Sequence, residues 1–144
     1  MKTVTVSLDM DVPASIIWLI WSDLKNSPNW DKDVKICQIN GEFTEGTTGV
    51  CELKNGLKMK ITLDQVIFEK SWSNTAEIFG LTLKFHHWLD ITSSRSCQVT
   101  HQCDVSSVNF WPLRRILQTM LKKSLTDSLE NMKNLANKKW QPYS

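Results

Sequence analysis

The sequence lacks most features that mark membrane-spanning, zinc-binding or familiar catalytic proteins. Its densest apolar run, Ile16 to Trp21, is far shorter than the roughly 20 residues that a membrane-spanning helix needs. The four cysteines form no CxxC pair and have no zinc-like spacing. There is no nucleophile elbow, phosphate-binding loop or internal repeat. We therefore expect no stable membrane insertion, no metal and no cofactor.

The chain also lacks an excess of charge of either sign. Its 17 Lys and Arg and 15 Asp and Glu give a net charge of +2 and are scattered along the chain, which argues against a nucleic-acid partner. The basic cluster Arg114, Arg115, Lys122 and Lys123 is predicted to be a solvated helix face. Residues 1–11 have no apolar segment like that of a signal peptide, so we expect a cytoplasmic protein.

Tryptophan, by contrast, is abundant, with seven in 144 residues. Large aromatic side chains provide apolar area for a core, and they also line ligand sites. In a reducing compartment the four cysteines are expected to be free, buried thiols. They are Cys37, Cys51, Cys97 and Cys103.

A long amphipathic helix is predicted over about 109–139, with a short tail at 140–144. Its apolar residues recur every three or four positions, Asn109 is a candidate N-cap, and Pro112 falls in the first turn. Ser124 and Ser128 fall near the centre of the apolar face. Either they bond to the carbonyl four residues earlier, or they face an incompletely filled cavity.

The segments before this helix alternate in the manner of strands. A strand over Thr3 to Met10 is followed by a short apolar helix and a turn-rich stretch, and strands follow from Val34 onward. Asn55-Gly56 predicts a hairpin, and the change of phase at Gln65/Val66 predicts a bulge. The expected architecture is one α+β domain spanning 1–144.

Several strings resemble the SRPBCC superfamily of START-like, helix-grip proteins, and most closely its polyketide cyclase/dehydrase-like branch. They are Val6 to Asp23 (VSLDMDVPASIIWLIWSD), then Pro28, Asn29 and Trp30, the hairpin Thr92 to Asp104 (TSSRSCQVTHQCD) and the terminal helix. The resemblance implies a curved antiparallel sheet of about seven strands around the long C-terminal helix, with two short helices after the first strand. It also implies a hydrophobic cavity between sheet and helix. Because Tyr143 in the tail is the one tyrosine, no phenol is expected inside that cavity.

His87 and His101 form the most suggestive pair of polar residues. Both interrupt apolar strand faces, and a hairpin with the loop Thr92 to Ser96 would place them opposite each other, whereas a register shifted by two residues would pair His87 with Cys103. The same register sets Phe85 opposite Cys103. The two imidazoles are open to three interpretations: hydrogen-bonded core residues, anchors for a ligand head group, or, with a cysteine, part of a metal site.

The resemblance implies binding of a hydrophobic or amphipathic small molecule, such as a lipid, quinone or polyketide, by a carrier or sensor. The alternatives are a cyclase/dehydrase-like enzyme using His87 or His101 as proton carrier, and a protein-interaction module like the chaperone activators. Trp88, predicted on an outward face, leaves open a homodimer or protein partner. The predicted cavity residues are Trp18, Trp30, Met59, Ile61, Phe85, His87, His101, Cys103, Leu117, Met120, Leu121, Ser124 and Ser128.

Overall fold

A single curved antiparallel sheet forms the body of the protein, in a computed structural model that describes residues 2–78, 80–105 and 111–140. Its seven strands follow the spatial order β1-β7-β6-β5-β4-β3-β2, so β1 and β2 are the edges. The predicted α+β class is confirmed. The elements are β1 (Lys2–Met10), α1 (Ala14–Ser22), the 3₁₀ helix η1 (Leu24–Asn29), β2 (Val34–Ile39), β3 (Thr48–Leu53), β4 (Lys58–Ile67), β5 (Ser71–Ile78), β6 (Leu81–Ser93), β7 (Ser96–Val105) and α2 (Trp111–Lys139).

Two local sequence signals set the register of the meander. The backbone N–H of Leu53 donates to the Leu57 carbonyl across the Asn55-Gly56 turn, where Gly56 has φ of 91°. Farther along, the pairing of β4 with β5 shifts between Leu63 and Gln65, as the phase change in the sequence predicts. Both predictions are confirmed.

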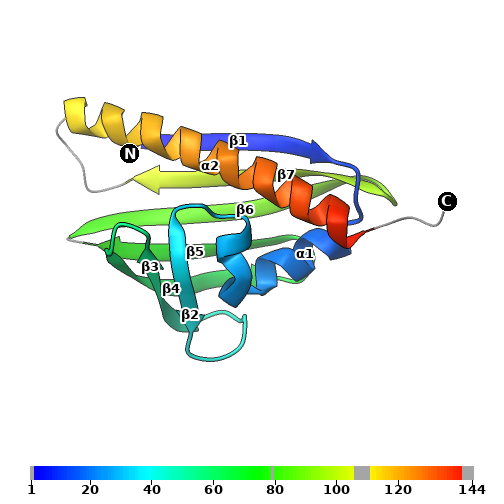
Figure 1. The fold of residues 1–144 in the computed structure, drawn as a ribbon, viewed down its shortest axis with the longest axis horizontal. Helices are drawn as coiled ribbons and strands as arrows, with labels where there is room; N and C mark the ends of the chain where they lie inside the picture. The colour runs from blue at the N-terminus through cyan, green and yellow to red at the C-terminus, as the bar shows by residue number, and fades with distance from the viewer. Residues whose placement is uncertain (1, 79, 106–110, 141–144) are drawn as a thin grey trace.

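All the helices cover the same face of the sheet (Figure 1). The long helix α2 packs along the edge strand β1, whereas η1 packs against β2 at the opposite edge. The short helix α1 contacts both α2 and η1 and completes the layer. Because the helices cover the two edges of a curved sheet, the inward side chains of the central strands face the space between them.

Only the second half of α2 is deeply buried. Leu129, Met132 and Ala136 are at most 2% exposed, whereas Ile116 and Met120 nearer its start are 57% and 62% exposed. Figure 1 shows the first turns of α2 reaching beyond the N-terminal end of β1. The predicted apolar stripe exists, but the sheet covers only part of it. The candidate N-cap Asn109 lies outside the described residues.

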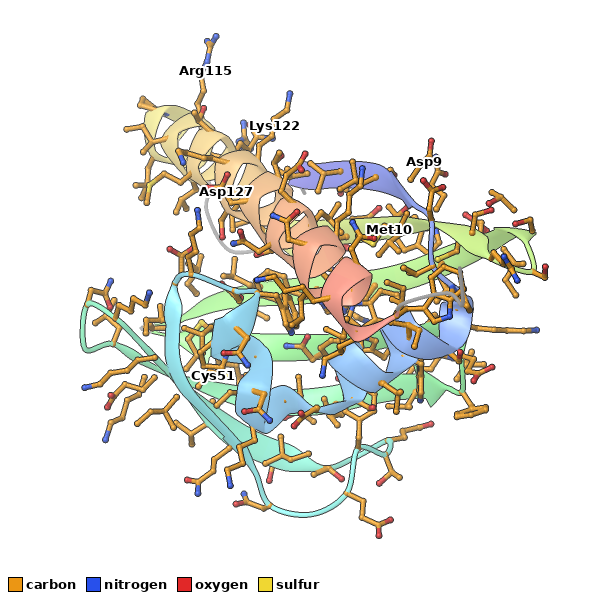
Figure 2. All side chains as sticks on the ribbon, turned by 45° about the vertical axis from the view of Figure 1, so that its right-hand side comes forward. Asp9, Met10, Cys51, Arg115, Lys122 and Asp127 are labelled. Carbon is orange, nitrogen blue, oxygen red and sulfur yellow. The ribbon has the colours of Figure 1, made fainter. Side chains whose placement is uncertain are left out.

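The outer face of α2 is polar, as the sequence predicts. Arg115 and Lys122 extend from the helix away from the sheet (Figure 2), and both are exposed. Lys123 forms an exposed ion pair with Asp127, four residues along the helix, at 2.9 Å. Within the described residues, no helix combines the length and apolar character needed to cross a membrane.

Candidate functional site

A cavity of about 210 Å³ lies between the inner face of the sheet, η1 and α2. This is below the roughly 300–1,000 Å³ of pockets for drug-sized ligands, and somewhat above the 150 Å³ of an engineered cavity that admits benzene. Its walls are mainly apolar. They comprise Leu24, Ser27, Trp30, Asp31, Asp33, Val34, Cys37, Cys51, Leu53, Met59, Ile61, Trp72, Asn74, Leu83, Phe85, His87, His101, Leu121, Ser124, Leu125 and Ser128.

The two histidines meet in the wall of this cavity. Pairing of β6 with β7 places His87 opposite His101 and Phe85 opposite Cys103, so the register predicted from the hairpin is confirmed. The imidazole centroids are 4.8 Å apart and the ring planes are nearly perpendicular, at 82°. Both side chains are buried.

His101 is held in one tautomer by the first helix. The indole Nε1 of Trp21 donates a hydrogen bond of 3.1 Å to Nε2 of His101. Because an indole can only donate, Nε2 must carry the lone pair, and the proton of the neutral ring is on Nδ1. Burial lowers the pKa of His101 to about 3, so the ring is neutral at pH 7.

His87 is held just as firmly from the other side. Its ring stacks on that of Trp72, with centroids 3.8 Å apart and planes 6° from parallel. Its Nδ1 lies 3.1 Å from the Trp72 backbone carbonyl, to which it donates, which leaves Nε2 as the acceptor nitrogen. Burial, assisted by His101, lowers the pKa of His87 well below its ordinary value.

Two indoles in the cavity wall lack a hydrogen-bond partner. Among the described residues, Nε1 of Trp30 and Nε1 of Trp72 are the buried side-chain nitrogen or oxygen atoms with none. Each of these tryptophans is only 5% exposed. A buried unpaired donor costs about 1–3 kcal/mol, so native proteins rarely keep one without a reason.

Acidic side chains line the part of the wall near η1 and α2. The Ser124 hydroxyl donates to Oδ2 of Asp33 at 2.6 Å, which fixes α2 to the loop before β2. Asp33 is exposed, so the cavity reaches the protein surface here. Burial raises the pKa of the neighbouring Asp31 to about 6, although the Asp33 backbone N–H donates to it.

Two thiols also face each other in this wall. Cys37 of β2 pairs with Cys51 of β3, and both are buried. Figure 2 labels Cys51. The pKa of Cys37 is lowered by a hydrogen bond from Cys51, and that of Cys51 is raised by the same contact and by burial. All four cysteines are free.

Nine of the predicted cavity residues lie in the wall. They are Trp30, Met59, Ile61, Phe85, His87, His101, Leu121, Ser124 and Ser128. Ser124 bonds to Asp33 and not to the carbonyl four residues before it, which favours the cavity interpretation over the helix-internal one. That these residues bind a ligand stays a prediction.

The other four predicted residues lie elsewhere. Trp18 packs in the core against the rings of Trp21, Phe43 and Phe68. Cys103 is fully buried in the core and is absent from the cavity wall. Leu117 and Met120 are on the first half of α2, which the sheet covers least, and Met120 lines a separate surface groove.

The sequence did not single out several wall residues. The strand of Trp72 shows little alternation, and Asp31 and Asp33 lie in a turn-rich loop, so no local pattern marks these three residues. Cys37 and Cys51 line the wall on β2 and β3, where η1 packs on β2, and periodicity does not reveal this contact. Within the described chain, no group of three or more His, Cys, Asp or Glu side chains is arranged to hold a metal ion.

Comparison with known proteins finds similarity in structure only. No protein-family model matches the sequence, and no curated protein does. Among solved structures, a protein from Mesorhizobium loti aligns with a TM-score of 0.80 at 14% identity, over 97% of this chain and 100% of that one. A START superfamily protein from Mycobacterium smegmatis aligns with a TM-score of 0.78 at 11% identity, over 96% and 99%.

Norcoclaurine synthase from Thalictrum flavum, solved with dopamine and hydroxybenzaldehyde, is also similar. Its TM-score is 0.76 at 15% identity, over 98% of this chain and 89% of that one. Identities this low establish the fold alone.

Proposed function

Starting from a START-like, helix-grip fold of the SRPBCC type, we propose that this protein binds a small hydrophobic or amphipathic molecule in the cavity between sheet and α2, as a carrier or sensor. The observation that carries the proposal is the cavity itself, whose apolar walls contain a few firmly positioned polar groups. Four free cysteines suit the reducing cytoplasm in which we place the protein.

The size of the cavity favours a ligand of one or two rings over a long-chain lipid. A volume of about 210 Å³ leaves little room beyond that. The structurally similar norcoclaurine synthase was solved with two single-ring aromatic compounds, which agrees with this range of size. Burying about 200–300 Å² of ligand surface contributes roughly 5–7 kcal/mol before the cost of immobilisation, so binding in the high-micromolar to millimolar range is expected.

A cyclase/dehydrase-like enzyme is less well supported. A general base works best with a pKa near the operating pH, and the pKa of His101 is lowered to about 3. The Nε2 lone pair of His101 is already used by Trp21, and His87 is also a weak base. A binding protein requires only that these rings stay in place.

Native mass spectrometry of the freshly purified protein tests the proposal. A discrete additional mass of one- or two-ring size, released on denaturation, would support it and would identify the chemical class. A thermal-shift panel of one- and two-ring compounds covers the case of a ligand lost on purification, because a ligand at 100 times its Kd stabilises by about 2.7 kcal/mol. An apo mass together with no stabilisation by any compound would contradict it.

A further inference from the structure

The buried indoles differ in one respect that bears on the ligand. Nε1 of Trp21 donates to His101, whereas Nε1 of Trp30 and Nε1 of Trp72 have no partner. All three rings are at most 5% exposed. Trp30 and Trp72 line the cavity, and Trp21 does not. The unpaired donors are therefore the two that border the empty space.

These two indoles flank the histidine pair. The Trp30 ring lies 6.0 Å from that of His101, and the Trp72 ring stacks on His87 at 3.8 Å. Neither histidine relieves them: Nε2 of His101 already accepts from Trp21, and neither indole N–H is hydrogen-bonded to Nε2 of His87, the acceptor nitrogen that remains. The two unpaired donors thus belong to side chains that line the cavity, and an acceptor atom of a bound molecule would satisfy them.

The charges around the cavity restrict that acceptor further. Asp31 and Asp33 line the wall, and among the described residues that line it none is Lys or Arg. A carboxylate ligand would accept from the indoles, but its charge would be desolvated near these acids with no cation to pair it. A neutral carbonyl oxygen accepts up to two hydrogen bonds and avoids this cost.

We propose that the ligand is a small neutral carbonyl compound, a ketone or ester of one or two rings, whose oxygen accepts a hydrogen bond from Trp30 or Trp72. This inference rests on the proposed function and specifies its ligand. The unpaired indole donors favour a ligand with a carbonyl oxygen, and the size of the cavity favours a short ring system. The negative charge of the two aspartates disfavours carboxylate ligands.

Three probes built on the same bicyclic ring test this: indane, 1-indanone, which adds one oxygen atom, and indane-2-carboxylate, which adds a charged group. None reacts readily with the Cys37 and Cys51 thiols. In a purely apolar cavity indane would bind best, because desolvating an unpaired carbonyl costs about 1–3 kcal/mol. We expect 1-indanone to bind about tenfold more tightly than indane, and the carboxylate at least tenfold more weakly than the ketone.

The tryptophan resonances supply a readout in the unchanged protein. In ¹H–¹⁵N spectra each indole N–H gives its own signal, assigned by single Trp→Phe changes. Binding of 1-indanone, but not of indane, should move the N–H proton of Trp30 or Trp72 downfield. The Trp21 signal serves as an internal control, because its N–H is already donated to His101.

The Trp30→Phe and Trp72→Phe variants test the same point by affinity. Together they should abolish the preference for 1-indanone over indane. If indane binds as well as the ketone and neither indole signal moves, this inference is overturned while the proposed binding function stands. If none of the three probes binds, this inference is overturned, and the native mass and the wider panel of compounds decide the proposed function.

Discussion

The indole of Trp21 on α1 and the imidazole of His101 on β7 form a buried hydrogen bond of 3.1 Å, 80 residues apart in sequence. The bond fixes α1 to the sheet behind the cavity and sets the tautomer of the histidine. It also requires a neutral ring, because a protonated imidazole has no lone pair to offer. The cavity wall is therefore sensitive to acid.

The first prediction concerns acid stability. The unfolded chain binds protons at His101 below about pH 6.5, whereas the folded chain resists until about pH 3. The free energy of unfolding should therefore fall as the pH falls through this interval, by a few kcal/mol in order of magnitude. His101→Gln keeps an acceptor for Trp21 but does not titrate, so chemical denaturation between pH 6.5 and 4 should show a shallower slope. Equal slopes for the unchanged protein and His101→Gln would contradict the assignment of this acid sensitivity to His101.

Asp31 has the opposite pH dependence, which gives the second prediction. Its pKa rises from 3.8 to about 6 on folding, because burial favours the neutral carboxyl group. The contribution of Asp31 to the free energy of unfolding is therefore fully present below about pH 4 and is lost as the pH rises through 6. Asp31→Asn should stabilise the protein by about 1–3 kcal/mol at pH 8 and by much less at pH 4. Asp11→Asn, at an exposed site, removes the same charge as a control. A destabilised Asp31→Asn protein at pH 8 would refute this account.

The third prediction tests the β2 edge of the sheet. A methyl group added at Gly49 would overlap the Gln38 carbonyl oxygen and crowd Ile39 on the neighbouring strand. Gly49→Ala should therefore cost about 1–3 kcal/mol in urea denaturation and should loosen the wall that holds Cys37 and Cys51. Val50→Ala, at the exposed neighbouring position, should cost less. A neutral Gly49→Ala would show that β2 is paired differently.

Local patterns in the sequence predicted the elements and their register well. The Asn55-Gly56 turn, the bulge before Gln65 and the His87–His101 pairing each depend on a few neighbouring residues, and each is confirmed. Periodicity identifies the apolar face of a helix, but it does not tell how much of that face a sheet covers. For this reason the sequence placed Leu117 and Met120 in the cavity, although the sheet leaves that half of α2 largely uncovered.

The polar chemistry of the site was harder to foresee. The stacking of Trp72 on His87 and the lack of a partner for Trp30 depend on side-chain packing between distant segments. Asp31 looks like any loop acid until η1, β2 and the cavity enclose it. Such features arise from tertiary contacts, and no local pattern encodes them.

The most direct test of the central claim is a calorimetric titration of 1-indanone into three proteins: the unchanged chain, Ser124→Phe and Thr126→Phe. Ser124 lines the cavity and Thr126 is exposed on the same helix, so both variants add the same ring and only one adds it at the cavity wall. The account predicts binding to the unchanged chain and to Thr126→Phe, and an affinity at least tenfold lower for Ser124→Phe. Equal affinity in all three, or no binding to the unchanged chain, would contradict it.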